Sequence, residues 1–200
     1  MTNRFSVVIL AAGTSSRLGS DKLSLPLGNK SILEHTMHKF FLDAIDEVVI
    51  VTGKFKPEFQ KQKTAPKIKY VDNPDYEAGM SSSVKKGLEC ISLSTDAVFI
   101  TPADIPLFDV NTVREMIGAF SQKTIIIPTY HGKKGHPVLL DKFFSEQCLN
   151  EHSEKVLYDV IKKNSVSVKF LPVEDEGVLL DLDTKEDYER MKRFIDSENF

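Results

Sequence analysis

The chain begins with a short apolar run that changes abruptly into a loop of small and polar residues. Residues 7–11 are all apolar and start with three β-branched side chains, a pattern typical of a strand buried on both faces of a sheet. The loop over residues 12–22 contains two glycines and two cations, Arg17 and Lys22. Small residues let a ligand approach the backbone, and consecutive N–H groups can bind an anion. We therefore interpret this loop as a polyphosphate-binding loop.

The loop differs from the two common phosphate-binding motifs. Walker A requires Gly-x-x-x-x-Gly-Lys-Ser/Thr, whereas Gly13 and Gly19 are one residue further apart and Ser20 follows them. The dinucleotide fingerprint needs a glycine where this chain has Ser15. On spacing alone, an ordinary strand-to-helix turn with incidental charges remains an alternative.

Length and composition narrow the class of protein. The 200 residues suit one domain with a sizeable core, so we expect a single domain over 1–200. A net charge of −3 without a basic face argues against nucleic acid as a partner. Cys90 and Cys148 belong to no CxxC pair, so we expect neither zinc nor a disulfide. No segment resembles a signal peptide or a membrane span, so we expect a cytoplasmic protein.

Apolar segments with strand and helix periodicity alternate along the chain, which predicts an α/β fold with a mostly parallel sheet. After the first strand, we expect strands at 47–52, 67–71, 96–101, 124–128, 166–171 and 178–182. The expected helices lie at 31–42, 81–91, 110–120, 141–149, 155–163 and 185–195. Ser31 and Glu34 have the spacing of a capping box at the start of the first helix. Gly87 lies inside the second and lowers its stability unless another element packs closely there.

Acidic side chains follow two of the predicted strands, at the edge where parallel sheets bind ligands. Asp104 lies between Pro102 and Pro106, in surroundings where an ionised carboxylate needs a partner. Mg²⁺ is a suitable partner because it binds one or two carboxylates together with phosphate oxygens. A simple turn aspartate is the alternative.

The second acidic group is Asp181 and Asp183, which alternate with Leu182 and would share one face of a strand. Thr184 and Asp187 have the spacing of a helix cap, which leaves the two preceding carboxylates unexplained. A metal ion shared between this group and Asp104 would require the carboxylates to lie within about 10 Å of one another.

A third polar feature is the loop between Asn73 and Gly79, which ends at three serines, residues 81–83. Hydroxyl groups at this position can cap the helix or donate hydrogen bonds to a ligand at its positive end. Both interpretations stay open on the sequence.

Taken in order, these motifs resemble the MobA-like nucleotidyltransferases. The first motif is Leu10-Ala11-Ala12-Gly13-x-Ser15-x-Arg17-x-Gly19-x-x-Lys22, and the later ones are Asn73…Gly79-Met80-x-x-Ser83-x-x-x-Gly87, Pro102-x-Asp104-x-Pro106, Gly135-His136-Pro137 and Asp181-x-Asp183-Thr184. The second alanine of the first motif, the serines after Gly79 and the Gly-His-Pro motif are similar to the branch that uses CTP, the molybdenum cofactor cytidylyltransferases.

The resemblance implies a Rossmann-like three-layer α/β/α fold and Mg²⁺-dependent transfer of CMP from CTP to the phosphate of molybdopterin or its molybdenum form, with release of pyrophosphate. It also suggests a molybdoenzyme partner. The site residues it implies are Leu10, Ala11, Ala12 and Gly13 at the nucleotide, Arg17, Lys22 and Asp104 in catalysis, Asn73, Gly79 and Ser83 at cytosine and ribose, Asp104 with Asp183 or Asp181 at the metal, and His136 at the acceptor.

One segment departs from the family pattern. Residues 150–155 lack the Gly-Asp-x-Gly-Ala-Arg-like sequence that family members usually carry. A sugar phosphate or methylerythritol phosphate is therefore an alternative acceptor, and GTP an alternative nucleotide. A non-catalytic accessory protein is a further alternative, although the presence of Arg17, Lys22 and both carboxylate sites argues against it. The missing dinucleotide fingerprint argues against a nicotinamide oxidoreductase.

Overall fold

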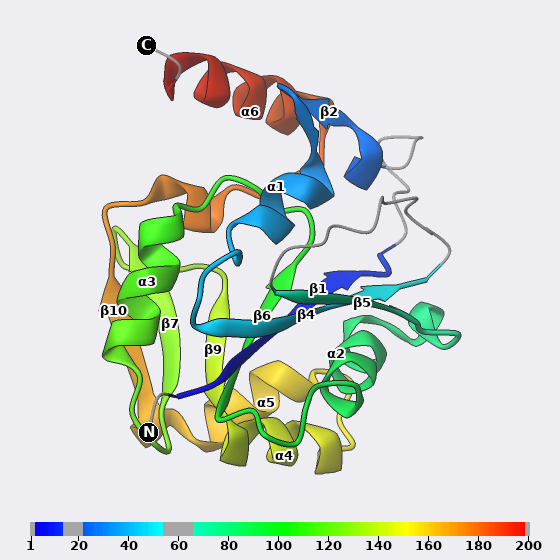
Figure 1. Ribbon diagram of the computed structural model, residues 1–200, viewed down its shortest axis with the longest axis vertical. Helices are drawn as coiled ribbons and strands as arrows, with labels where there is room; N and C mark the ends of the chain where they lie inside the picture. Colours follow the sequence, from blue (N-terminus) through cyan, green and yellow to red (C-terminus); the bar gives the residue numbers. More distant parts are fainter. Residues whose placement is uncertain (1–2, 14–21, 54–65, 199–200) are drawn as a thin grey trace.

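The computed structural model describes residues 3–13, 22–53 and 66–198. In this part of the chain an eight-stranded sheet forms the centre of the molecule (Figure 1). Its strands are β1 (Phe5–Ala11), β4 (Ile45–Thr52), β5 (Lys67–Asp72), β6 (Ala97–Pro102), β7 (Ile125–Tyr130), β8 (Lys133–Lys134), β9 (Val138–Asp141) and β10 (Val168–Pro172). A separate small hairpin consists of β2 (Pro26–Leu27) and β3 (Lys30–Ser31).

Helices cover both faces of the sheet. They are α1 (Ile32–His38), α2 (Met80–Glu89), α3 (Val110–Ala119), α4 (Lys142–Asn150), α5 (Val156–Lys163) and α6 (Lys185–Glu198), with short 3₁₀ turns η1 (Lys22–Ser24), η2 (Tyr76–Ala78), η3 (Ser165–Ser167) and η4 (Glu176–Leu179). Helices α1, α3 and α6 pack on one face and α2, α4 and α5 on the other (Figure 1). The predicted three-layer α/β/α architecture is confirmed. In the described residues, no helix has the length and apolar character needed to cross a membrane.

Strand β1 is the centre of both hydrophobic cores. Phe5, Val7 and Ile9 point into the core beneath α1 and α3, whereas Val8 and Leu10 point into the core beneath α2, α4 and α5. All seven residues of β1 are buried. The unbroken apolar pattern of this segment therefore follows from its burial on both faces, as predicted.

The strand order is β10-β7-β9-β6-β1-β4-β5. The chain moves outward from β1 through β4 to β5 and then returns to the other side of β1 with β6. Ligands of such sheets bind beyond the carboxyl ends of the strands, at the point where the order reverses. Here that point lies between β1 and β6.

Strand β9 runs antiparallel to both neighbours, β6 and β7. Its first residue, Val138, pairs with Ile100 near the carboxyl end of β6. The preceding His136 and Pro137 are therefore brought to the same edge of the sheet as the ends of β1 and β6.

Two predicted elements differ from the structure. The first helix starts at the predicted capping box of Ser31 and Glu34 but ends at His38 rather than at residue 42. The prediction of a strand at 178–182 is wrong, because this segment is a 3₁₀ turn followed by extended chain. The residues do alternate between buried and less buried. Their backbone groups, however, form hydrogen bonds with loops and not with a neighbouring strand. Val178 O accepts from His136 N–H at 2.9 Å, and Leu182 N–H donates to Asp104 O at 3.0 Å.

Helix α2 packs against the sheet at Gly87. A Cβ atom at this position would lie 2.3 Å from Cγ1 of Val8 and 3.0 Å from Cγ2 of Val51. Strands β1 and β4 therefore do pack closely against this glycine, which is the condition under which the sequence analysis allowed a glycine inside the helix.

We predict that Gly87→Ala lowers the free energy of unfolding by about 1–3 kcal/mol, because the buried central strands cannot move away from the added methyl group. The matched control is Gly118→Ala in α3, where no other atom lies within 4 Å of the added Cβ. The control should raise the free energy of unfolding by about 0.5–1 kcal/mol. Chemical denaturation measures both, and equal effects would contradict the packing explanation.

Candidate active site

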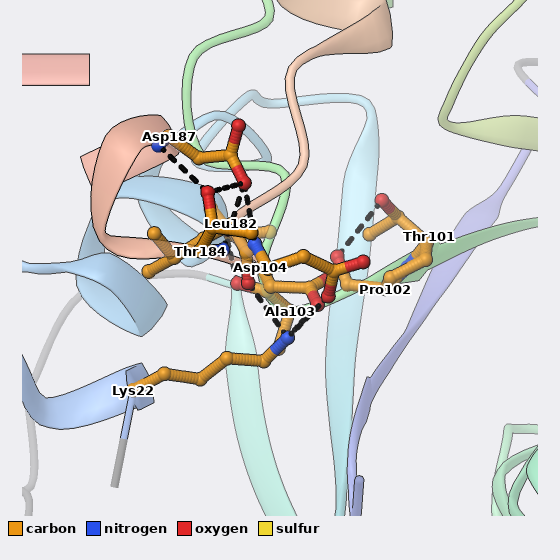
Figure 2. A network of polar contacts seen from close by, with 10 residues as sticks. Lys22, Thr101, Pro102, Ala103, Asp104, Leu182, Thr184 and Asp187 are labelled. Carbon is orange, nitrogen blue, oxygen red and sulfur yellow. Dashed lines mark hydrogen bonds and ion pairs between the residues drawn. The ribbon is translucent and has the colours of Figure 1, made fainter. Parts of the chain in front are cut away.

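The ammonium group of Lys22 lies at the centre of a polar cluster at the carboxyl edge of the sheet (Figure 2). Its Nζ donates to Oδ2 of Asp104 at 2.6 Å, to the carbonyl oxygen of Leu182 at 2.8 Å and to Oδ1 of Asp183 at 3.3 Å. The three contacts come from segments that are about 80 residues apart along the chain. The cluster is therefore a product of the tertiary fold.

Backbone hydrogen bonds hold the segments of this cluster together. Ala103 N–H donates to Leu10 O at 3.0 Å, which fastens the loop after β6 to the end of β1. The Asp104 carbonyl accepts from Leu182 N–H, which fastens the late segment to the same loop. The side chain of Asp187 accepts from Thr184 N–H at 2.8 Å and Asp183 N–H at 3.2 Å. The predicted helix cap at Thr184 and Asp187 is therefore confirmed.

The two main carboxylates lie close together. Because their oxygens are 2.6 Å and 3.3 Å from the same Nζ, Asp104 Oδ2 and Asp183 Oδ1 are at most about 6 Å apart. This satisfies the expected limit of about 10 Å for a shared ion.

Asp181 has a different position from the one predicted. The argument that it shares a strand face with Asp183 fails, because there is no strand at this segment. Partial burial, and then the charges of Asp183 and Asp104, raise the pKa of Asp181. Asp181 therefore belongs to the same acidic edge, but among the described contacts only Asp183 of the two reaches the ammonium of Lys22.

The ammonium of Lys22 forms ion pairs with the carboxylates of Asp104 and Asp183. Burial alone would lower the pKa of Lys22, but hydrogen bonds and charge from Asp104, and then from Asp183, outweigh it and raise the pKa. Lys22 is therefore cationic at neutral pH and pairs with two carboxylates, those of Asp104 and Asp183. The short separation of these two carboxylates fits a divalent cation. The described residues contain no group of three or more metal-ligating side chains, so such an ion would need substrate phosphate oxygens or water as further ligands.

The predicted nucleotide loop is described only at its two ends. Leu10 and Ala11 are the last residues of β1, and Ala12 is buried just beyond it. Gly13 is exposed, and a Cβ atom added there would have no other atom within 4 Å. Arg17, together with residues 14–16 and 18–21, lies outside the described residues. The polyphosphate-binding role of this loop therefore stays a prediction.

The side chain of Asn73 forms hydrogen bonds with other residues of the chain. Its side chain is buried, and Nδ2 donates to the hydroxyl groups of Ser82 at 2.9 Å and Ser83 at 3.0 Å. Its Oδ1 accepts from Asp75 N–H at 3.1 Å. These bonds fix the loop that leads to Gly79, which precedes α2 with a φ of 101°. Asn73 thus positions this loop and the start of α2, while direct contact with cytosine remains a prediction.

His136 lies between the carboxylate cluster and a cavity that we did not predict. Burial lowers the pKa of its ring more than the nearby charge of Asp104 and the backbone of Ile100 raise it. Its Nδ1 atom is buried without a hydrogen-bond partner in the described part of the chain. The ring therefore has an unused polar atom next to the cavity.

The cavity has a volume of about 650 Å³ and lies between α2, α5 and strands β7, β9 and β10. The pattern of apolar residues in α5 could have indicated this cavity from the sequence. In α5, Val156 and Val160 are buried in the core, but Leu157, Tyr158 and Ile161 form a second apolar stripe at helical spacing that faces the cavity. A surface helix needs only one such stripe to pack on a sheet.

Comparison with known proteins shows the family. The MobA-like NTP transferase domain matches residues 7–168. The chain belongs to this family. Its members and structural neighbours are nucleotidyltransferases, and the chain is an enzyme of this class.

Two relatives and one solved structure illustrate the similarity. The molybdenum cofactor cytidylyltransferase of Escherichia coli is 29% identical over 183 residues, covering 90% of this chain and 92% of the relative. A probable molybdenum cofactor guanylyltransferase of Thermococcus sibiricus is 27% identical over 196 residues, covering 92% and 96%. The structure of Rv0371c from Mycobacterium tuberculosis in complex with manganese superposes with a TM-score of 0.72 at 20% identity, covering 96% and 100%.

We predict that Lys22→Met lowers the free energy of unfolding by about 2–3 kcal/mol, because Asp104 and Asp183 then face each other without the ammonium. The melting temperature should fall by about 4–10 °C. Mg²⁺ should recover more of the melting temperature in the variant than in the wild type, since the two cations compete for the same oxygens. Lys192→Met, which removes a surface pair with Glu189, is the control and should change little. Equal effects of Mg²⁺ on all three proteins would contradict a shared cation position.

Proposed function

We propose that this chain is a Mg²⁺-dependent cytidylyltransferase that transfers CMP from CTP to the phosphate of a molybdopterin-type acceptor and releases pyrophosphate. The observation that carries this proposal is the cluster of Lys22, Asp104 and Asp183 at the switch point between β1 and β6. Membership of the MobA-like NTP transferase family supports a nucleoside triphosphate as the donor.

The preference for CTP rests on the residues at the end of β1. Ala12 is buried, with 5% of its surface exposed, and its methyl group stands where the resemblance gives the guanylyltransferase branch a glycine. In the proposed complex this methyl group would reduce the space beneath the base and so favour the smaller cytosine. Similarity to the cytidylyltransferase of Escherichia coli agrees with this preference. Similarity to a guanylyltransferase makes GTP the alternative nucleotide.

In the proposed reaction, an oxygen of the acceptor phosphate attacks the α-phosphorus of CTP. The bond between the α-phosphorus and its bridging oxygen breaks, and pyrophosphate leaves with that oxygen, without a covalent enzyme intermediate. Phosphoryl-type transfer of this kind depends mainly on positioning and on neutralisation of charge. The fold holds the ammonium of Lys22 in place before the substrate binds, so neutralisation requires little reorganisation.

The other residues have roles that follow from their positions. Asp104 and Asp183, rather than Asp181, would hold Mg²⁺, which when bound neutralises charge on the triphosphate oxygens. Arg17 would add a second cation at the triphosphate, and the backbone from Leu10 to Gly13 would contact the nucleotide. Ser83 and Gly79, held in place by Asn73, would contact cytosine and ribose. His136 would face the acceptor.

We predict that Asp104→Asn lowers Mg²⁺-dependent release of pyrophosphate by a factor of about 100–1,000, because the ion and the ammonium both lose a ligand. Pyrophosphate is followed with CTP, Mg²⁺ and a panel of phosphorylated acceptors. Asp46→Asn is the control, since Asp46 pairs with Arg4 at the opposite edge of the sheet. Circular dichroism verifies that both variants are folded. Retained turnover in Asp104→Asn would remove this residue from the proposed site.

We also predict that CTP raises the melting temperature more than GTP does. A ligand present at about 100 times its Kd stabilises the folded state by about 2.7 kcal/mol, which corresponds to about 5–10 °C for a chain of this size. Ala12→Gly should reduce the difference between the two nucleotides, because it removes the methyl group. Equal shifts with CTP and GTP in the wild type would contradict the cytidylyl assignment.

A further inference from the structure

Lys22 opens the 3₁₀ turn η1, which leads directly into the small hairpin of β2 and β3 outside the central sheet (Figure 1). Leu25 N–H donates to Lys22 O at 3.3 Å, and Ile32 N–H donates to Leu25 O at 3.1 Å. The backbone of Lys22 is therefore bonded to the hairpin. A shift of the hairpin would move the ammonium group relative to the carboxylates that it contacts.

Two leucines place this segment against the hydrophobic core. Leu23 and Leu27 have 5% and 0% of their surface exposed, and both belong to the core beneath α1 and α3. Apolar contacts of this kind stabilise the segment but have no preferred direction. Hydrogen bonds do have one. The position of the hairpin along its neighbours is therefore set by its polar contacts.

Helix α6 binds the hairpin through its first turns. The hydroxyl group of Tyr188 donates a hydrogen bond to the carbonyl oxygen of Pro26 in β2. The preceding residue, Asp187, accepts from the N–H group of Asp183 at 3.2 Å. Two consecutive residues of α6 thus hold the hairpin and the backbone of Asp183. They fix where Asp183 lies relative to the segment that begins at Lys22.

The side chain of Tyr188 is itself held in place. Its ring packs against the core, and Nζ of Lys192 lies 4.6 Å from the ring centre. The turn of the hairpin contacts the same helix further along, because a Cβ atom at Gly28 would lie 3.7 Å from Cγ2 of Ile195. The hairpin therefore lies along α6, and the Tyr188 hydroxyl provides a directional bond within this contact.

Helix α1 binds the hairpin with the same arrangement of two consecutive residues. The ring of His35 donates from Nε2 to Leu27 O at 2.6 Å, since a carbonyl oxygen can only accept. The next residue, Thr36, is fully buried and donates from Oγ1 to Ala103 O at 2.9 Å. Because Ala103 precedes Asp104, helix α1 holds both the hairpin and the loop that carries this carboxylate.

We propose that Tyr188 and His35 are positioning residues that act on Lys22 through the hairpin. They hold the backbone of Lys22 at the place from which its ammonium reaches Asp104 and Asp183 and would neutralise the triphosphate. A lysine side chain is flexible, so its head group stays in place only if its backbone is held. A displacement of about 1 Å can lower a rate by about 100-fold. This inference rests on the proposed function and adds two residues that do not touch the substrate.

The first test measures steady-state release of pyrophosphate from CTP. Tyr188→Phe removes one hydroxyl group and keeps the ring, and His35→Leu removes the N–H donor. Each should lower kcat about tenfold and change KM for CTP by less than about twofold, because Lys22 would act on charge that develops on the leaving pyrophosphate. His35→Gln keeps an N–H donor and should recover most of kcat. Loss of kcat in His35→Gln as well would overturn the role of His35.

Two variants are matched controls. Tyr130→Phe also removes a tyrosine hydroxyl, but in the described part of the chain this hydroxyl forms no hydrogen bond and the ring contacts His131. His38→Leu changes a histidine one turn further along α1, whose Nδ1 has no hydrogen-bond partner among the described residues. Both should keep the kcat and KM of the wild type. Circular dichroism verifies that every variant is folded.

The second test does not depend on turnover. Trace acetylation with acetic anhydride, followed by mass spectrometry, reports how readily each lysine of the folded protein reacts. Its two carboxylate partners keep Lys22 protonated and slow to react. In Tyr188→Phe and His35→Leu the rate at Lys22 should rise about threefold, because the amine is held less closely to these carboxylates. Lys163, which pairs with Glu151, is the internal control and should react as in the wild type.

The two tests separate this inference from the proposed function. If Lys22 reacts faster in both variants while the wild type releases no pyrophosphate from any nucleotide, the two residues hold Lys22 as inferred and the proposed function is wrong. If the wild type turns over, and Tyr188→Phe and His35→Leu match it in kcat or in the reactivity of Lys22, the inference is wrong and the proposed function stands.

Discussion

The ammonium of Lys22 is the physical link between the parts of this molecule that matter for chemistry. It binds two carboxylates and one carbonyl oxygen that come from the loop after β6 and from the segment before α6. The cost of placing these charges at a partly dry edge is offset by their mutual attraction and by the backbone bonds between the same segments. The cluster therefore exists before any substrate binds, which is the condition under which fixed charges are most effective in catalysis.

The sheet provides the frame for this cluster. Strands β1 and β6 are buried on both faces, and the hydrogen bond from Ala103 to Leu10 holds their ends together. The tight contact of Gly87 with Val8 and Val51 sets how closely α2 approaches the same strands. The serines that follow Gly79 are thus positioned by packing in the core as well as by the side chain of Asn73.

Local patterns predicted much of the fold. The apolar strands and the caps at Ser31 and Thr184 are encoded by a few neighbouring residues, and they occur as expected. The segment 178–182 shows the limit of this approach. Its alternating burial is the pattern of a strand, but its hydrogen-bond partners are Asp104 and His136, which no local pattern can identify.

The sequence also predicted part of the candidate site, but not all of it. Motif order placed Lys22, Asp104 and Asp183 at one site, and their side chains are in contact. The reason given for Asp183 was wrong, because it follows extended chain that is hydrogen-bonded to the loop of Asp104, not a strand. Motif order could not assign the amide of Asn73 to the interior of its loop, since that depends on two hydroxyl groups in α2. It also missed the cavity, which requires α5 and the edge strand β10 to be placed in space.

The reversed direction of β9 has a consequence for how such an enzyme can change. The proposed nucleotide site uses residues up to Asp104 together with Asp183, whereas β7, β9, α5 and β10 supply most of the cavity wall. The two sites meet at His136, because β9 starts next to the carboxyl end of β6. Exchanging residues 125–170 between relatives would therefore change most of the cavity wall while Lys22, Asp104 and Asp183 are kept.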